Sequence, residues 1–176
     1  DLSGLQVVDI TNPASPQIVG TVGTPGPAND VAVSGTHAYV ADGSSGLKVI
    51  DIVNPQSPQI VGSWNTPGLA LAIAIAGAYA YVADDTYGLQ VFNITNPHSP
   101  QRVATVDTPG HAQGVAVSGN FAYLADGSSG LQVVDISSPQ NPVIVANVAA
   151  WSARDVTPSG YYLYVASASE GVLVVS

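Results

Sequence analysis

Short segments rich in Val, Ile, Tyr and Thr recur along the chain, separated by clusters of Gly, Pro, Asn and Asp. In one representative stretch they occupy residues 29–34, 37–42, 46–52 and 59–65. This alternation predicts short β-strands joined by turns. Helices are not expected, because the 18 Gly and 13 Pro residues are spread along the chain and interrupt helical patterns.

Several of these segments are almost continuously apolar, among them AIAIA (72–76), LKVIDI (47–52) and QIVGSW (59–64). A strand with one face in water would instead alternate apolar and polar side chains. The pattern therefore predicts sheets that are covered on both faces, as in sheets stacked face against face.

The segments belong to an internal repeat. Gly4, Gly46, Gly88 and Gly130 are spaced 42 residues apart, and Gly171 follows after 41. Residues 4–45 and 46–87 are identical at 24 of 42 aligned positions. We therefore treat residues 1–176 as a single repeat region, with units of approximately 1–27, 28–69, 70–111, 112–152 and 153–176.

Four antiparallel strands per unit, covered on both faces, predict the blades of a β-propeller. A parallel β-helix is the competing all-β fold, but its coils are shorter and do not need two hairpin turns per repeat. The pattern gives seventeen strands, one more than four blades require. A portion of a larger ring of six to eight blades fits this number better than a closed four-blade ring, and assembly of two copies into one ring is a third possibility.

The chain opens on DLSGLQVVDI and stops on GVLVVS, both inside a repeat, so we expect a portion of a longer polypeptide. Membrane insertion is not expected. The uncharged, mostly apolar segment 68–83 has 16 residues, whereas a spanning helix needs about 20. The equivalent stretches of the neighbouring repeats carry polar or charged residues.

Three basic and twelve acidic residues give a net charge of −9. Nucleic acid is therefore not an expected partner, because its binding requires a basic stripe that displaces counterions. The chain has no Cys, which excludes disulfides, thiolate metal sites and a Cys nucleophile.

The sequences GLKVIDIVNPQSPQIVG (46–62) and GLQVVDISSPQNPVIVA (130–146) resemble the LVIVD repeat of bacterial and archaeal extracellular β-propellers. AVSGTHAYVAD (32–42) is similar to the related YVTN repeat of surface-layer propellers. The resemblance covers essentially the whole chain and implies a propeller fold, secretion and a role at the cell surface. It implies no reaction, because the motif carries no catalytic residue. Asn93, in place of Asp, and residues 167–170 depart from the pattern.

Candidate binding residues lie where the repeats differ, in the stretches 26–30, 68–72, 110–114 and 151–155 that precede each inner strand. In a propeller these positions surround the mouth of the central channel, where a ligand can bind. Drift of an unconstrained loop would give the same variation. The groups suited to hydrogen bonding and stacking are Asn29, Asp30, His111, Gln113, Trp151, Arg154 and Asp155.

No catalytic residue, metal site or cofactor is assigned. The three His residues lie in non-equivalent contexts and have no metal-ligand spacing. The recurring Asp42, Asp84 and Asp126 are interpreted as turn caps in preference to calcium ligands, because the turns lack alternating carboxylates. A second recurring set is interpreted as caps at strand ends; it comprises Asp9, Asp51 and Asp135.

The sequence thus predicts a non-catalytic extracellular or cell-surface module that presents propeller loops to a protein or glycan. The alternative is an enzyme domain in which Asp30, His111, Arg154 and Asp155 converge at the channel mouth. A further expectation is association of the terminal blades with another copy or with the rest of a longer chain, because a terminal sheet exposes an apolar face.

Overall fold

The computed structural model describes residues 4–149 and 152–176, and within these residues it contains seventeen β-strands and no helix. The strands are β1 (Leu5–Asp9) and β2 (Gln17–Val22); β3 (Asp30–Ser34), β4 (His37–Ala41), β5 (Leu47–Asp51) and β6 (Gln59–Trp64); β7 (Ala72–Ala76), β8 (Tyr79–Ala83), β9 (Leu89–Asn93) and β10 (Gln101–Val106); β11 (Gly114–Ser118), β12 (Phe121–Ala125), β13 (Leu131–Asp135) and β14 (Val143–Val148); and β15 (Ala153–Ser159), β16 (Tyr162–Ser167) and β17 (Gly171–Val175).

The strands form three four-stranded sheets, flanked by the two-stranded sheet β1–β2 and the three-stranded sheet β15–β17. Every pairing is antiparallel between consecutive strands. In the first complete unit the predicted strand limits agree with the observed ones within one residue at each end. The predictions of an all-β chain and of four-stranded antiparallel sheets are confirmed.

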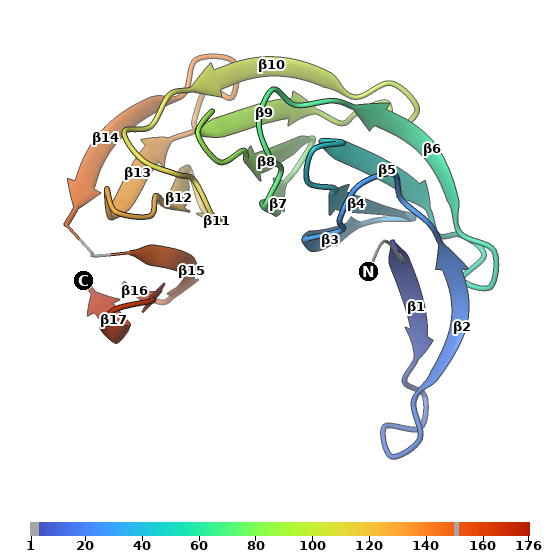
Figure 1. Ribbon diagram of the computed structural model, residues 1–176. Coiled ribbons are helices and arrows are strands. Elements are labelled where there is room, and N and C mark those ends of the chain that lie inside the picture. The colour runs from blue at the N-terminus through green and yellow to red at the C-terminus, as the bar shows by residue number, and fades with distance from the viewer. Residues whose placement is uncertain (1–3, 150–151) are drawn as a thin grey trace.

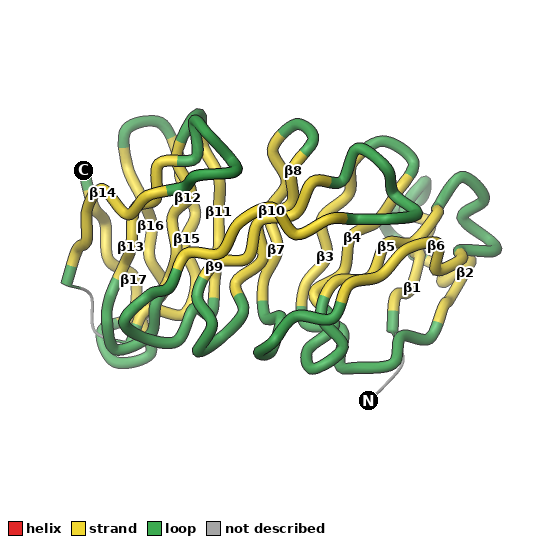
Figure 2. The backbone as a smooth tube through the Cα atoms, turned by 90° about the horizontal axis from the view of Figure 1, so that it is seen from above, coloured by secondary structure: helices red, strands yellow, loops and turns green. Residues whose placement is uncertain are grey.

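The sheets are arranged in an arc (Figure 1). The first strands β3, β7, β11 and β15 lie along its concave side and contact one another in that order. The fourth strands β2, β6, β10 and β14 lie along its convex side. Seen from above, the strands run between two edges of the arc, and the turns and connections lie along these edges (Figure 2).

The core lies between successive sheets. Tyr39, Leu47 and Val49 of one sheet pack against Val82 and Phe92 of the next, and all five are at most 3% exposed. The same contact recurs between β7–β10 and β11–β14 and, with fewer buried residues, between β11–β14 and β15–β17. In the complete sheets β3–β6 and β7–β10 the two middle strands are almost wholly buried. The expectation of covered faces is therefore met by these middle strands, but it is wrong for the run QIVGSW of β6, an outer strand in which Ile60 is 38% exposed.

The terminal sheets differ, because each has a neighbour on one side only. In β17, Val172 and Val174 are 68% and 59% exposed, and in β1 Val8 is 44% exposed. No described segment is a helix long and apolar enough to cross a membrane.

The turns at strand ends follow the chemistry expected from the sequence. Asp51 accepts a hydrogen bond from the Val53 N–H at 2.8 Å, and Asp135 accepts one from the Ser137 N–H at 2.8 Å. Asn93 accepts one from Thr95 at 2.9 Å, so its amide preserves the turn that Asp forms in the other repeats. These are Asx turns, which confirms the interpretation of this set as caps at strand ends.

The second hairpin of each unit depends on a glycine that has both a positive φ and close neighbours. Gly46 has φ +72°, and a Cβ atom there would lie 2.3 Å from the Trp64 carbonyl oxygen and 2.4 Å from the Thr66 nitrogen. Gly35, in the first hairpin, has φ +57° but would place a Cβ in open space. Gly46 is therefore required both for its positive φ and for its lack of a side chain, whereas Gly35 is required for its positive φ alone.

We predict that Gly46→Ala lowers the free energy of unfolding by about 3 kcal/mol, because it combines left-handed strain with a clash against the backbone of the fourth strand. Gly35→Ala carries the strain alone and should cost about 1 kcal/mol. Urea denaturation measures both variants, and equal losses would contradict the close packing at Gly46.

Candidate functional site

The connections that precede the inner strands form a row along one edge of the arc, here called the rim (residues 26–30, 68–72, 110–114 and 152–155). The last three of these connections are each held by the preceding sheet. The bridges Gly43↔Ala70, Asp85↔Ala112 and Gly127↔Ala153 pair the central Ala of a connection with the second turn of the sheet before it. The repeats thus place equivalent, chemically different side chains next to one another in order.

Asn29 and Asp30 bind the first complete sheet to the next one. The Asn29 amide donates to the Ala70 carbonyl oxygen at 2.9 Å. Asp30 accepts from the Val31 N–H and, through its other oxygen, from the Ile73 N–H, each at 2.8 Å. Both residues also line a hollow of about 230 Å³ beside the N-terminal sheet. The Asp30 carboxylate and the Asn29 amide therefore already form hydrogen bonds that hold neighbouring sheets together.

Asp155 and Arg154 lie at the start of β15. Asp155 accepts from the Val156 N–H at 2.8 Å, and its Cα lies 2.8 Å from the position that a Cβ of Gly114 would occupy. This close approach explains why glycine stands at position 114. Arg154 is exposed. Trp151, the stacking group expected from the sequence, lies outside the described residues.

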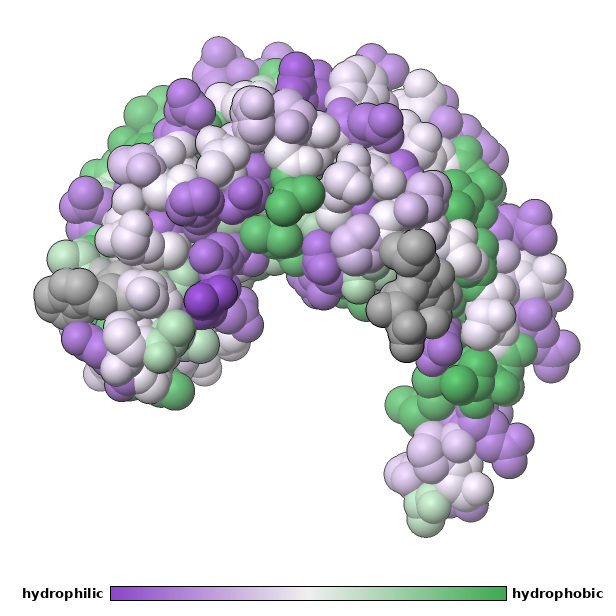
Figure 3. Space-filling view, in the orientation of Figure 1, coloured by the Kyte–Doolittle hydropathy of each residue, from purple (hydrophilic) through white to green (hydrophobic). Residues whose placement is uncertain are grey.

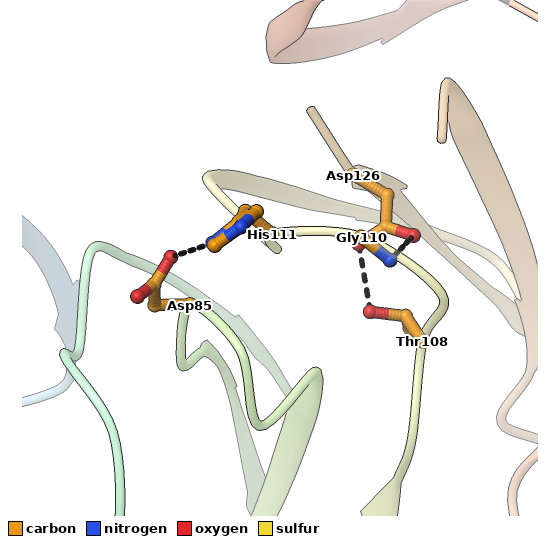
Figure 4. A network of polar contacts seen from close by, with 5 residues as sticks. All are labelled: Asp85, Thr108, Gly110, His111 and Asp126. Atoms are coloured by element: carbon orange, nitrogen blue, oxygen red, sulfur yellow. Dashed lines mark hydrogen bonds and ion pairs between the residues drawn. The ribbon is translucent and has the colours of Figure 1, made fainter. Parts of the chain in front are cut away.

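His111 contacts a residue that the sequence analysis did not single out. Its Nδ1 lies 2.8 Å from an Asp85 carboxylate oxygen, and the two side chains are 56% and 24% exposed (Figure 4). Asp85 stands in the turn between β8 and β9, and the Asp85↔Ala112 bridge brings this turn beside His111. The pair therefore joins two sheets at the rim.

Asp85 has φ 50°, a left-handed conformation that glycine adopts at the equivalent Gly43 and Gly127. A non-glycine residue in this region is unusual and accumulates at functional sites. The replacement of DG by DD at 84–85 was the available sequence signal. This substitution could not be interpreted from the sequence, because the contact between the turn at Asp85 and the connection at Ala112 is visible only in the fold.

The buried Asp residues of the second hairpin bind the incoming connection. Asp42, Asp84 and Asp126 have no exposed surface. Asp126 accepts from the Gly110 N–H at 3.0 Å and from the Thr108 hydroxyl at 2.7 Å (Figure 4). Asp42 and Asp84 accept in the same way from Gly26 and Gly68, at 2.9 and 3.1 Å. They were expected to cap their own turns, whereas these side chains hold a segment 16 residues earlier.

Burial raises the pKa of the Asp126 carboxyl group, while the hydrogen bonds from the Thr108 hydroxyl and the Gly110 N–H act in the opposite direction. Burial likewise raises the pKa of Asp84. Among the described residues, no group of three or more His, Asp or Glu side chains is placed to hold a metal ion.

The four groups of the enzyme alternative are not joined. Within residues 4–149 and 152–176, Asp30, His111, Arg154 and Asp155 share no hydrogen bond or ion pair with one another. Their partners are the Ile73 and Val156 backbones and Asp85. Gln113 lies near His111, over Gly127. The rim presents separate polar groups to solvent: Asn29, His111, Arg154 and Asp155 are exposed, and Gln113 is half-buried.

We predict that Asp126→Ala lowers the free energy of unfolding by about 2 kcal/mol, because it leaves the Gly110 N–H and the Thr108 hydroxyl without their buried acceptor. Asp107→Ala, an exposed carboxylate on the same connection, is the matched control and should have little effect. Urea denaturation compares them. A loss for Asp126→Ala no larger than that for the control would show that the connection does not depend on this carboxylate.

Comparison with known proteins shows the family. The LVIVD repeat model matches residues 1–24, 25–66, 67–108, 109–150 and 151–175. No curated protein sequence matches. Among solved structures, the computationally designed Ika4 protein aligns with a TM-score of 0.71 at 13% identity, over 87% of this chain and 92% of its own. The computationally designed Ika8 protein aligns equally well, over 90% of this chain but 48% of its own, so this chain spans about half of that protein. The five tiled matches leave almost none of the sequence uncovered, and the chain belongs to the LVIVD repeat family.

Proposed function

We propose that the chain is a portion of a larger β-propeller that acts as a non-catalytic interaction module, binding a protein or glycan at the rim. The observation that carries the proposal is the contrast within the repeats. Successive units share the same buried hydrogen bond from a Gly N–H to an Asp carboxylate. Their exposed rim side chains differ from unit to unit. A rigid frame with variable polar groups is suited to recognition.

The larger ring is supported by the arc itself and by a comparison. The sheets β1–β2 and β15–β17 are incomplete and stand at the two ends of the arc (Figure 1). The chain aligns with 48% of the longer Ika8 chain at the same TM-score as with nearly all of Ika4. An arc of this size therefore fits within a structure of about twice its length.

The electrostatics support a partner other than nucleic acid. The net charge is −9, and the three basic residues lie in three different sheets. Lys48 is 5% exposed, with its Nζ donating to the Ser45 carbonyl oxygen. No basic stripe is available to replace phosphate counterions. The resemblance to secreted repeats supports a location outside a bacterial or archaeal cell or on its surface.

We predict that the double variant His111→Ala, Arg154→Ala weakens binding to glycans on a defined array about tenfold or more, because each lost hydrogen bond to a ligand is worth about 1 kcal/mol. His98→Ala is the matched control, since His98 is exposed in the turn between β9 and β10, away from the rim. The measurement is binding of fluorescently labelled protein to the immobilised glycans. Equal binding by the rim variant and the control would contradict a ligand site at the rim.

A further inference from the structure

The C-terminal end of the arc exposes a face that is buried in the sheets β3–β6 and β7–β10. Tyr164 is 43% exposed and Val172 is 68% exposed. The equivalent residues two and three repeats earlier are buried: Tyr39, Tyr81, Leu47 and Leu89 are between 0 and 3% exposed. One repeat earlier, Leu131 is buried and Tyr123 is half-buried. Inside the arc this face packs against the following sheet. At β15–β17 no following sheet is present in the described chain.

The N-terminal end exposes the opposite face. Val31 and Val33 of β3 are 46% and 62% exposed, whereas Ile73, at the position of Val31, is 5% exposed. The strands β1 and β2 cover only part of this face, through Leu5 and Val22, which pack against Ala38, Val40 and Ile50. Apolar side chains gather over this end of the molecule (Figure 3). The two ends are thus the two halves of the contact that joins sheets inside the arc.

The incomplete sheets are also complementary in their strands. The sheet β1–β2 corresponds to third and fourth strands and lacks the inner pair that would cover Val31 and Val33. The sheet β15–β17 has an inner pair but lacks a fourth strand. A Cβ at Gly171 would meet no atom within 4 Å, whereas at Gly4, Gly46 and Gly88 it would lie within 2.3 Å of a carbonyl oxygen at the end of the fourth strand.

A hollow lies beside the last two sheets, on the side of β17 where a fourth strand would pair. It measures about 440 Å³ and is lined by Ala146, Val148 and Tyr161 among others. The positions equivalent to Ala146 are Gly20 and Gly62 in the first two units and Ala104 in the third, where a Cβ is accommodated against the cluster that contains Ile136. A Cβ at either glycine would lie about 2 Å from the carbonyl oxygen of a Pro in the turn that leads into the next fourth strand. Such a turn, residues 12–16, precedes β2.

We infer that two copies of this chain join end to end into one closed ring, in which β15 and β16 of each copy complete the sheet begun by β1 and β2 of the other. Each copy has three complete sheets, so with one shared sheet at each of the two junctions the ring has eight. At each junction β1 of one copy and β17 of the other are equivalent third strands, and only one of them can pair with β16. β1 reads LQVVD, identical to the buried β13, and is the better fit.

This inference rests on the proposed larger ring but not on the proposed ligand. Further repeats of a longer polypeptide would cover the same two faces as a second copy does. The oligomeric state of the 176-residue chain distinguishes a second copy from such repeats. A closed pair uses each face once per copy, which is a stringent geometric requirement. Contact in the wrong orientation would leave two apolar faces exposed and would continue into a filament.

The test is the solution mass of three single variants by light scattering. Tyr164→Asp places a charge in the C-terminal face, and Val33→Asp places one in the N-terminal face. Val53→Asp is the control, because Val53 is 68% exposed but lies in a turn of an interior sheet. We expect the unmodified chain and the control to have twice the monomer mass of 17.8 kDa. Each end-face variant should have the monomer mass, because both junctions of its ring are damaged.

Mixing the two end-face variants provides a second readout. The mixture retains one undamaged junction, between the intact C-terminal face of Val33→Asp and the intact N-terminal face of Tyr164→Asp, so pairs should form again. This rescue also requires that both variants are folded. An unmodified chain that stays at 17.8 kDa at every concentration would overturn the inference while leaving the larger ring open to other repeats. A mass that grows without limit, or a mixture that stays monomeric, would overturn it as well.

Discussion

The structure depends on the burial of apolar side chains between sheets that face one another. Leu47, Val49, Leu89 and Val91 are all 0% exposed because a second sheet covers the face that carries them. Burying such a side chain completely contributes about 1.5–3 kcal/mol. A single sheet of this sequence would leave one of its faces in water, so no unit of the repeat is expected to be stable alone.

Polar groups fix how the sheets are placed. The buried carboxylates of Asp42, Asp84 and Asp126 hold the connection that leads out of the preceding sheet. Asn29 and Asp30 add direct hydrogen bonds to the next unit. The carboxylate contacts recur in three successive units at the same edge of the arc, so the rim is attached to the buried frame at repeated points. The exposed His111 and Arg154 therefore stand on a rigid support.

The sequence was sufficient to predict what repeats. The period, the strand limits and the caps such as Asp51 follow from local chemistry. The continuous apolar runs correctly predicted covered faces for the middle strands, but not for β6 on the convex side. The partners of the rim residues could not be predicted, because they depend on which turn meets which connection in three dimensions. His111 meets Asp85, 26 residues earlier, and neither residue type requires the other. Likewise, the role of Asp126 in holding Gly110 became evident only from the fold.

Hydrogen exchange of backbone amides tests the stacking most directly. Measured at a concentration low enough to keep the chain monomeric, the amides of β4, β5, β8 and β9 should exchange slowest, because their strands are covered on both faces. Those of β1 and β17 should exchange fastest among the strands, since each belongs to an incomplete sheet with one open face. Equal protection of terminal and central strands would contradict the claim that stability comes from one sheet covering another.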